Sequence, residues 1–425
     1  MFFSQKIKIL FCCLWYLVLM VPMQAQNAED EIIEDDDTLE TDSAWVDSII
    51  IRSDTLPWPQ NIQAEIDRLL THDMFQTSQL GLMIWDLDAD SAIYRFNERQ
   101  LMRPASTMKT ITAIAALDRL GGSYQFKTEL CYTGQVDSCV LNGDVYCVGG
   151  FDPRFNTDDM RAFVEGLHKM GIDTIRGNIY SDKSMKDQNM FGEGWCWDDD
   201  NPVLSPLLIS RKDHFMERFY TELRKMGIYI TGAIGEKRKP HEANCIVRRF
   251  HTIDQILMRM MKESDNLYAE AMFYQLAAST GNHPASAKSA RAMIRQLVNK
   301  LGLDGSHYQF ADGSGLSLYN YVSAELEVRL LRYAYENENI YNHLLPSLPI
   351  AGQDGTLKRR MHSQFTRGNV RAKTGTLTGI SSLCGYLTAA NGHRLCFCII
   401  NQGVMHGKNG RSFQDKVCSI LCSPQ

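Results

Sequence analysis

The order in which strand-like and helix-like segments follow one another restricts the fold of this chain more than any other feature of its sequence. Residues 80–87 and 92–96 alternate apolar and polar side chains, as two neighbouring strands do. Helical spacing of apolar residues begins at Pro104, ends at Gly121, and returns over residues 253–276. Early and late strands separated by helices predict an antiparallel sheet packed by helices. Three late strand candidates lie at residues 370–374, 383–388 and 395–400.

A final helix and an inserted segment complete the predicted architecture. A helix that begins near residue 413 would pack on the sheet, and the Asn-Gly pair at residues 391–392 predicts a tight turn between the last two strands. Between about Cys131 and Ile234 the sequence changes to short strands and many turns, which indicates a separate unit. We therefore expect the α+β class: an antiparallel five-stranded sheet flanked by helices, a helical subdomain and an inserted β-rich domain. The expected boundaries are residues 58–128 and 250–425 for the main domain and 129–249 for the insert.

The N-terminus has the pattern of an export signal followed by a linker. Lys6 and Lys8 precede an apolar run at residues 9–21, so we expect residues 1–25 to be a cleaved signal peptide. The apolar run is too short to span a bilayer comfortably, and we expect an exported, periplasmic protein with no membrane anchor in its mature form. Residues 26–57 contain eleven acidic residues against one basic residue, and such a self-repelling block predicts an extended acidic linker.

Composition and charge exclude several classes of protein. A length of 425 residues predicts two or three compact units, and a hydrophobic content of 44% can supply their cores. The net charge is −6, mostly because of the acidic linker, so the basic excess of a nucleic-acid-binding protein is missing and we expect no nucleic-acid partner. The sequence contains no Cys-x-x-Cys pair and no His-Glu-x-x-His run, so we predict neither a metal site nor another cofactor.

The twelve cysteines leave two possibilities open. Export favours disulfides, and Cys131 and Cys139 could bridge a hairpin. However, Cys396 and Cys398 alternate along a predicted strand, and two more cysteines near the C-terminus repeat at helical spacing. These patterns fit buried thiols equally well.

The first chemical motif, Ser-Thr-Met-Lys at residues 106–109, lies at the start of a predicted helix. A serine hydroxyl is a poor nucleophile at neutral pH and must lose its proton as it attacks. Three residues along a helix place Lys109 one turn above Ser106 on the same face, so its amine can reach the hydroxyl oxygen. The lysine must then be neutral some of the time, which a second cation nearby, Lys373, would favour. We expect Lys109 to face an open cleft and to contribute little to the core.

Two further motifs, Ser-Asp-Asn at residues 264–266 and Lys-Thr-Gly-Thr at residues 373–376, offer groups that bind a peptide. On a short loop between helices, alternate residues can face one cleft, so that Ser264 relays a proton and Asn266 holds a substrate carbonyl. The other motif lies on an expected edge strand, which offers unpaired backbone groups to an extended peptide. Gly375 would remove the side chain that blocks this peptide, and the lysine and threonines suit a carboxylate.

The three motifs in this order are the signature of penicillin-binding proteins and serine β-lactamases. Each motif alone is weak, but their order and their predicted helix, loop and strand contexts argue against coincidence. More specifically, the chain resembles the D-Ala-D-Ala carboxypeptidase/endopeptidases of peptidase family S13, the low-molecular-mass class C penicillin-binding proteins. The resemblance extends from about residue 80 to residue 402. It includes residues 104–109, 143–145, 152–153, 194–199, 264–270, 312–317, 348–352 and 354–357.

The resemblance implies the β-lactamase/DD-peptidase-like transpeptidase fold and a serine acyl-transfer enzyme that acts on peptidoglycan peptides and is inhibited by β-lactams. Ser106 would attack the bond between two D-alanines, or between a D-alanine and a cross-linked diaminopimelate, with Lys109 as base. Ser264 and Lys373 would pass a proton to the leaving amine, and Asn266 would position the acyl chain. The substrate-binding residues implied are Thr374 and Thr376 at the terminal carboxylate, Gly375 between them, Asp199 at the diaminopimelate side chain and Ser314 in the cleft.

The sequence departs from the family in its insert and leaves two other functions open. Ser264 follows Asp199 by only 65 residues, which is shorter than usual for the family, so part of the insert is expected to be reduced. A serine β-lactamase would share the acylation residues, but a class A enzyme needs a deacylating glutamate in a Glu-x-x-x-Asn setting on a loop after the second motif. We expect no such setting in this chain, and a large insert is foreign to that enzyme. A non-catalytic protein that binds wall peptides is the other alternative, and three intact motifs argue against it.

Overall fold

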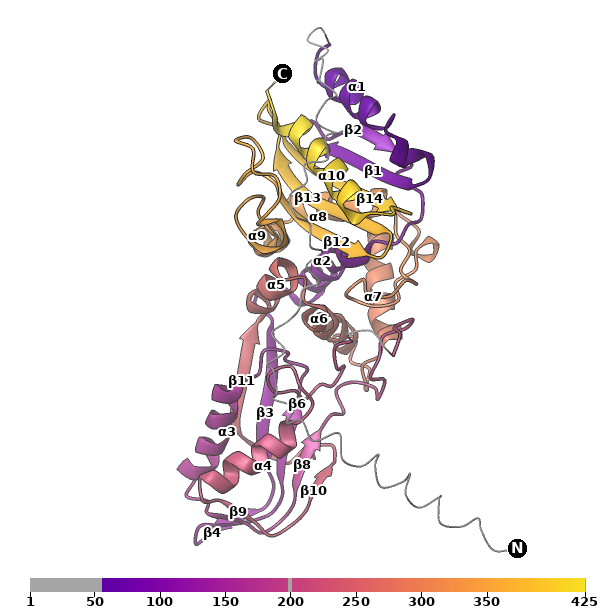
Figure 1. The fold of residues 1–425 in the computed structure, drawn as a ribbon. Helices are drawn as coiled ribbons and strands as arrows, with labels where there is room; N and C mark the ends of the chain where they lie inside the picture. Colours follow the sequence, from indigo (N-terminus) through magenta and orange to yellow (C-terminus); the bar gives the residue numbers. More distant parts are fainter. Residues whose placement is uncertain (1–55, 198–200, 425) are drawn as a thin grey trace, which may run out of the picture. The chain divides into compact units, whose positions relative to one another are not determined.

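The computed structural model describes residues 56–197 and 201–424; the predicted signal peptide, most of the predicted linker and Asp199 lie outside the described residues. Its first sheet joins strands from both ends of the described chain, and all its neighbouring pairs are antiparallel, which confirms the predicted class (Figure 1). The order is β12-β13-β14-β1-β2. These strands are β1 (Gln79–Asp86), β2 (Ser91–Phe96), β12 (Arg371–Leu377), β13 (Ile380–Thr388) and β14 (Arg394–Gln402).

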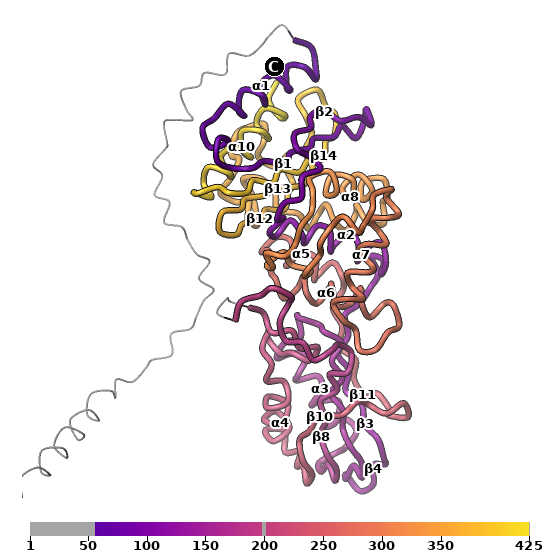
Figure 2. Tube along the Cα trace, turned by 90° about the vertical axis from the view of Figure 1, so that its right-hand side faces the viewer, coloured from indigo at the N-terminus to yellow at the C-terminus, as the bar shows by residue number. Residues whose placement is uncertain are grey.

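The alternation of side chains along the central strands explains why helices cover both faces of this sheet. In β14, Leu395 and Phe397 belong to one core cluster, whereas Cys396 and Cys398 belong to the cluster on the opposite face. Figure 2 shows the first and last described helices close to each other on the former face. Helices α1 (Gln60–Leu69) and α10 (Gly407–Cys422) cover the face that carries Leu395 and Phe397. Helix α8 (Ala324–Glu336) covers the face that carries Cys396 and Cys398.

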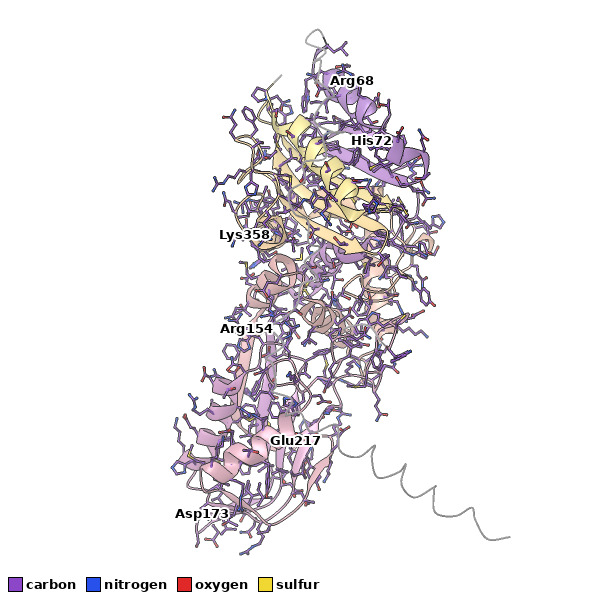
Figure 3. The ribbon with its side chains drawn as sticks, in the orientation of Figure 1. Arg68, His72, Arg154, Asp173, Glu217 and Lys358 are labelled. Carbon is purple, nitrogen blue, oxygen red and sulfur yellow. A yellow bond between two sulfur atoms is a disulfide. The ribbon has the colours of Figure 1, made fainter. Side chains whose placement is uncertain are left out.

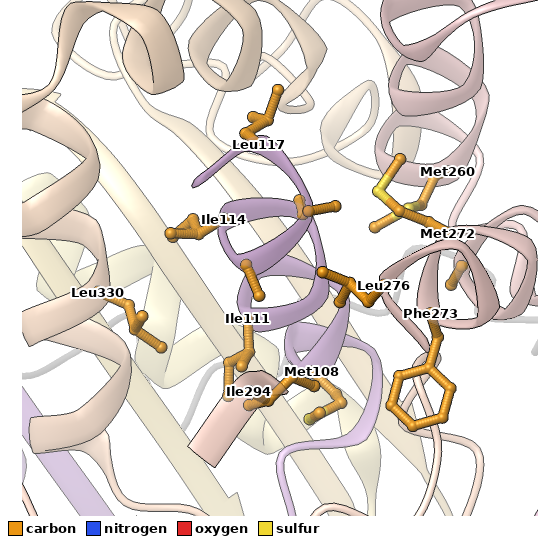
Figure 4. Close-up of a cluster of buried hydrophobic side chains, with 14 of the residues drawn as sticks. Met108, Ile111, Ile114, Leu117, Met260, Met272, Phe273, Leu276, Ile294 and Leu330 are labelled. Carbon is orange, nitrogen blue, oxygen red and sulfur yellow. The ribbon is translucent and has the colours of Figure 1, made fainter. Parts of the chain in front are cut away.

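The largest core cluster surrounds helix α2 (Met108–Leu120), which lies between the sheet and the other helices. Its apolar side chains, such as Ile111 and Ile114, pack among those of Phe273 and Leu330 from two other helices (Figure 4). Because α2 contacts neighbours on most sides, its first ten residues are all buried. The helical subdomain predicted from spacing is therefore present. Its other helices are α5 (Ile253–Lys262), α6 (Asn266–Ala278), α7 (Ala287–Lys300) and α9 (Glu338–Ser347).

The segment predicted as an insert forms a second sheet with a core of its own. Strands β3 (Gln125–Tyr132) and β11 (Asn244–Thr252) pair antiparallel and run across the two predicted boundaries of the insert. The insert also contains helices α3 (Thr157–Lys169) and α4 (Phe215–Lys225), although only strands and turns were predicted. Helix α4 is amphipathic: Phe219 is buried in this core, whereas Glu217 is exposed (Figure 3). The sheet order is β10-β8-β6-β3-β11, with β6 (Val145–Gly149), β8 (Ile179–Asp182) and β10 (Ile234–Glu236), and a smaller sheet contains β4 (Gln135–Asp137), β5 (Val140–Asn142), β7 (Thr174–Ile175) and β9 (Tyr229–Ile230).

One disulfide differs from the hairpin bridge considered above. Cys131 on β3 is bonded to Cys245, its register partner on β11, while Cys139 is an exposed free thiol. The two cysteines are 114 residues apart in sequence. They meet because their strands pair, not because they are close along the chain. Cys396 and Cys398 are buried free thiols, as their alternation allowed. Within residues 56–197 and 201–424, no helix combines the length and the hydrophobicity needed to cross a bilayer.

Candidate active site

Ser106 lies in a tight 3₁₀ turn that leads directly into α2, and its side chain is half-buried. The preceding residue, Ala105, has a φ of +51°, a left-handed conformation that is costly for a residue other than glycine. Two hydroxyl groups hold the carbonyl of Pro104 just before it: Ser382 Oγ donates at 2.5 Å and Thr107 Oγ1 lies 2.9 Å away. Neighbouring structure therefore fixes the backbone that presents the Ser106 hydroxyl.

Lys109 is fully buried, which corrects the expectation of a lysine facing an open cleft. Its Nζ lies 3.0 Å from Ser106 Oγ, 2.7 Å from Asn266 Oδ1 and 2.8 Å from the Ser314 carbonyl oxygen. Burial lowers the pKa of Lys109 from 10.5 to about 8, and the negative charge of Asp312 is the largest effect in the other direction. A lysine with this pKa is neutral often enough at neutral pH to accept a proton from the serine.

Two buried acids to which the sequence analysis assigned no role, Glu270 and Asp312, hold the loop beside Lys109. The backbone N–H of Gly313 donates to Glu270 Oε1 at 3.0 Å, and that of Gly315 donates to Asp312 Oδ1 at 2.8 Å. Burial, and next the charge of Asp312, raise the pKa of Glu270 to about 8. The two acids thereby fix the backbone between them, which carries the carbonyl that contacts Lys109. Both acids lie in segments that resemble the family, residues 264–270 and 312–317, and Glu270 lies one helical turn after the Ser-Asp-Asn motif, which was the available signal for it.

Ser314 contributes to the site through its backbone. Its side chain is fully buried and its hydroxyl donates to Asp312 Oδ2 at 3.4 Å, whereas its carbonyl accepts from Lys109. Trp195, from the inserted segment, donates its indole N–H to the same Asp312 oxygen at 2.8 Å. The insert therefore reaches the loop behind the lysine. Asp199, four residues after this tryptophan, lies outside the described residues.

The Ser-Asp-Asn motif forms the junction between α5 and α6. Asp265 caps α6 and accepts hydrogen bonds from Arg259 Nε at 2.7 Å and Arg211 Nη1 at 2.5 Å. Ser264 has a φ of +59°, and Asn266 is the first residue of α6. Ser264 and Asn266 contact Lys373 and Lys109 respectively, so the acid between them holds two polar groups at the site. Within the described residues, Asn266 Nδ2 has no hydrogen-bond acceptor.

Lys373 lies on β12, which is the predicted edge strand of the first sheet. Its side chain is fully buried, and Nζ donates to Ser264 Oγ at 2.9 Å and to the Thr374 carbonyl at 2.7 Å. Burial, and next the positive charge of Lys109, lower the pKa of Lys373 well below its ordinary value. The structure therefore brings the catalytic residues predicted from the three motifs into two adjoining pairs, Ser106 with Lys109 and Ser264 with Lys373.

Gly375 serves a different purpose from the one predicted. A Cβ placed on it would lie 2.7 Å from the Pro104 carbonyl oxygen, 2.9 Å from Ser106 N and 2.1 Å from Ser382 Oγ. These atoms belong to the protein itself, so the glycine lets β12 approach the turn that carries the nucleophile. It does not simply clear space for a peptide.

The two threonines of β12 have different surroundings. Thr374 Oγ1 donates to Thr356 Oγ1 at 2.7 Å, whereas Thr376 is exposed. Thr356 follows Asp354, whose carboxylate lies 2.7 Å from Lys262 Nζ at the end of α5. This ion pair fixes the loop beside β12, so that several hydroxyl groups gather at the edge of the sheet.

Known proteins resemble this chain in sequence and fold. The model of the D-Ala-D-Ala carboxypeptidase 3 (S13) family matches residues 62–207 and 207–422. D-alanyl-D-alanine carboxypeptidase DacB of Haemophilus influenzae is 25% identical over 413 residues, which cover 77% of this chain and 86% of that protein. The D-alanyl-D-alanine carboxypeptidase of Actinomadura sp. (strain R39) is 26% identical, over 80% and 81% of the two chains. The crystal structure of penicillin binding protein 4 (dacB) from H. influenzae, complexed with a novel β-lactam, matches with a TM-score of 0.73 and 25% identity over 85% and 100% of the two chains.

Proposed function

The chain belongs to the D-Ala-D-Ala carboxypeptidase 3 (S13) family and is thus a serine-type hydrolase; on this premise we propose that Ser106 is its nucleophile. The proposed substrates are peptidoglycan stem peptides, cleaved between two D-alanines, between a D-alanine and a cross-linked diaminopimelate, or at both bonds. The observation that carries this proposal is the contact of 3.0 Å between the buried Lys109 Nζ and Ser106 Oγ. A nucleophile and its base within hydrogen-bond reach are what acyl transfer requires.

In the acylation step, neutral Lys109 takes the proton of Ser106 as Oγ attacks the carbonyl carbon of the substrate peptide bond. The carbonyl π electrons move to its oxygen and form a tetrahedral oxyanion. The backbone N–H groups of Ser106 and Thr376 are the proposed donors to that oxyanion. Asn266 Nδ2, which has no acceptor within the described part of the chain, would hold the carbonyl of the acyl portion, because its Oδ1 is already bonded to Lys109.

Collapse of the oxyanion breaks the carbon–nitrogen bond, and the departing amine needs a proton. Ser264 Oγ supplies it and is reprotonated through Lys373 Nζ, which lies 2.9 Å away. The proton that Lys109 took from Ser106 replaces the one that Lys373 gives, so that both lysines return to their starting forms. The product of this step is an ester on Ser106. Water then attacks the ester carbonyl and gives a proton to Lys109, which is neutral again after acylation. As the ester bond breaks, Lys109 passes this proton to Ser106 Oγ, and the shortened peptide leaves as a carboxylic acid. Serine is regenerated, and one water molecule is consumed for each bond cleaved.

Substrate binding would use the edge of β12. An extended peptide can pair with the free side of this strand, and the hydroxyls of Thr374 and Thr376 would bind its terminal carboxylate. Asp199 would contact the diaminopimelate side chain. Residues 1–25 would direct export to the periplasm, where such peptides occur. Acylation of Ser106 by β-lactams is part of the same proposal and is supported by the structure of the H. influenzae relative, which was solved with a β-lactam.

Release of D-alanine from a pentapeptide muropeptide tests the proposal. Wild-type protein should release it, Ser106→Ala should not, and the exposed remote serine variant Ser306→Ala should act like wild type. Mass spectrometry of the products, with a cross-linked muropeptide in parallel, measures both bond types. Activity retained by Ser106→Ala would refute the nucleophile assignment.

The lifetime of the adduct formed with penicillin distinguishes this function from that of a β-lactamase. We expect a long-lived penicilloyl adduct, whereas rapid multiple turnover of penicillin would favour a β-lactamase. The expectation that no Glu-x-x-x-Asn spacing of the kind used by a class A β-lactamase is present was wrong, because Glu338 and Asn342 have this spacing. Glu338, however, is exposed in the first turn of α9, so it does not have the surroundings of a buried deacylating base.

A further inference from the structure

A buried carboxyl group that the proposed chemistry does not use lies behind the nucleophile turn. Glu327, on α8, is completely buried, and its Oε1 lies 2.7 Å from Thr107 Oγ1. Its Oε2 has no hydrogen-bond partner among the described residues, although the weakly polar thiols of Cys384 and Cys398 lie nearby. An ionised carboxylate with a free oxygen in such surroundings would be costly.

The contacts of Thr107 indicate which form of this carboxyl group is present. A threonine hydroxyl has a single proton, yet Thr107 Oγ1 lies within hydrogen-bond distance of two oxygen atoms, Pro104 O at 2.9 Å and Glu327 Oε1 at 2.7 Å. Both contacts are satisfied if Glu327 is a neutral acid that donates to Thr107, which in turn donates to Pro104. Burial also raises the pKa of Glu327, in agreement with the neutral form.

This chain of hydrogen bonds ends on the carbonyl of the Pro104–Ala105 peptide group, one residue before the nucleophile. The Pro104 carbonyl accepts from Thr107 on one side and from Ser382 on the other. Ala105, which follows, has its left-handed φ of +51°, a conformation that persists only when its surroundings enforce it. The orientation of the Pro104 carbonyl, together with the conformation of Ala105, thus determines where Ser106 places its hydroxyl and its backbone N–H.

We propose that Glu327 is a positioning residue that, as a neutral acid, donates to Thr107 and so holds the Pro104–Ser106 turn in the geometry needed for acylation. It touches neither the substrate nor the reacting atoms. This inference rests on the proposed function, because acylation of Ser106 is the reaction that it affects.

Replacing Glu327 by glutamine and by methionine tests this role. Glu327→Gln keeps a donor of similar size, because its amide N–H can bond Thr107, so acylation should stay within about threefold of wild type. Glu327→Met keeps the volume and removes the unsatisfied oxygen, so the protein should fold, yet first-order acylation by a fluorescent penicillin should fall about 10- to 100-fold because the turn is released. The dissociation constant of the initial complex should change little. Asp159→Asn, at a buried acid of the inserted segment, is the matched control.

A double-mutant cycle with Thr107 tests the route of the effect. Thr107→Val removes the hydroxyl and should slow acylation as Glu327→Met does, the double variant should be no slower than Thr107→Val alone, and Thr107→Ser should restore the rate. Wild-type acylation in Glu327→Met, additive losses in the double variant, or equal losses in the glutamine and methionine variants would each overturn the proposal. If the wild-type protein itself were not acylated, the proposed function would fail instead, so the two failures are distinguishable.

Discussion

Replacing Gly375 by alanine should slow acylation of Ser106 strongly while most of the fold stays intact. The added Cβ would lie 2.7 Å from the Pro104 carbonyl oxygen and 2.9 Å from Ser106 N, and both are backbone atoms that cannot rotate away. It would also lie 2.1 Å from Ser382 Oγ, whose hydroxyl must turn aside and lose its bond of 2.5 Å to Pro104. Strand β12 and the nucleophile turn must therefore move apart by several tenths of an ångström.

This displacement determines the expected size of the effect. A misplacement of about 1 Å at a reacting group costs about 100-fold in rate, so a smaller shift of the turn predicts acylation about 10- to 100-fold slower than in wild type. Overpacking of this kind lowers the free energy of unfolding by about 1–3 kcal/mol. The loss of activity should thus exceed what partial unfolding explains.

Stopped-flow acylation by a fluorescent penicillin, together with denaturant unfolding, measures both effects. Gly235→Ala is the matched control, since this glycine also lies on an edge strand, β10, and its new Cβ would approach only the movable ring of Tyr180, at 3.2 Å. The control should be acylated at the wild-type rate. Wild-type acylation in Gly375→Ala would refute the conclusion that β12 holds the turn of the nucleophile.

Three further predictions concern other parts of the site. Because burial lowers the pKa of Lys109 to about 8 and the neutral amine is the base, acylation should rise with pH about tenfold per unit until about pH 8 and then level off, and a rate independent of pH between 6 and 9 would contradict this. Asp265→Asn keeps a helix-capping oxygen but removes the charge that Arg211 and Arg259 share, so the free energy of unfolding measured with urea should fall by about 1–3 kcal/mol, and an unchanged value would show that the two ion pairs do not stabilise the fold. Asp199→Ala should slow cleavage of diaminopimelate peptides more than that of simple D-Ala-D-Ala analogues, and equal losses would remove its proposed role in specificity.

Local patterns in the sequence predicted those parts of the structure that depend on neighbouring residues. The side chains of residues 395–400 belong alternately to the two core clusters, so both faces of β14 are buried, as a strand in this position requires. The spacing of Ser106 and Lys109 depends on one helical turn, and their side chains meet at 3.0 Å. The helices of the insert were missed even though α3 has a clear signal, a capping box that begins at Asn156.

Features that depend on contacts between distant segments could not be read from the sequence. The burial of Lys109 follows from the Ser314 loop and from α6, which close over it in three dimensions. The partner of Cys131 is fixed by strand pairing over 114 residues. Glu327 looks like any acid on an amphipathic helix until α8 is placed against the nucleophile turn. Motifs therefore identified the reacting groups, while the residues that support them became visible only in the fold.

The central claim, that Ser106 forms the covalent intermediate, is tested most directly by peptide mapping of the protein after brief exposure to penicillin. We predict one adduct per chain, with the mass of intact penicillin, on the peptide that contains Ser106, and no adduct in Ser106→Ala. An adduct on a different residue, or an unmodified wild-type protein, would contradict the account.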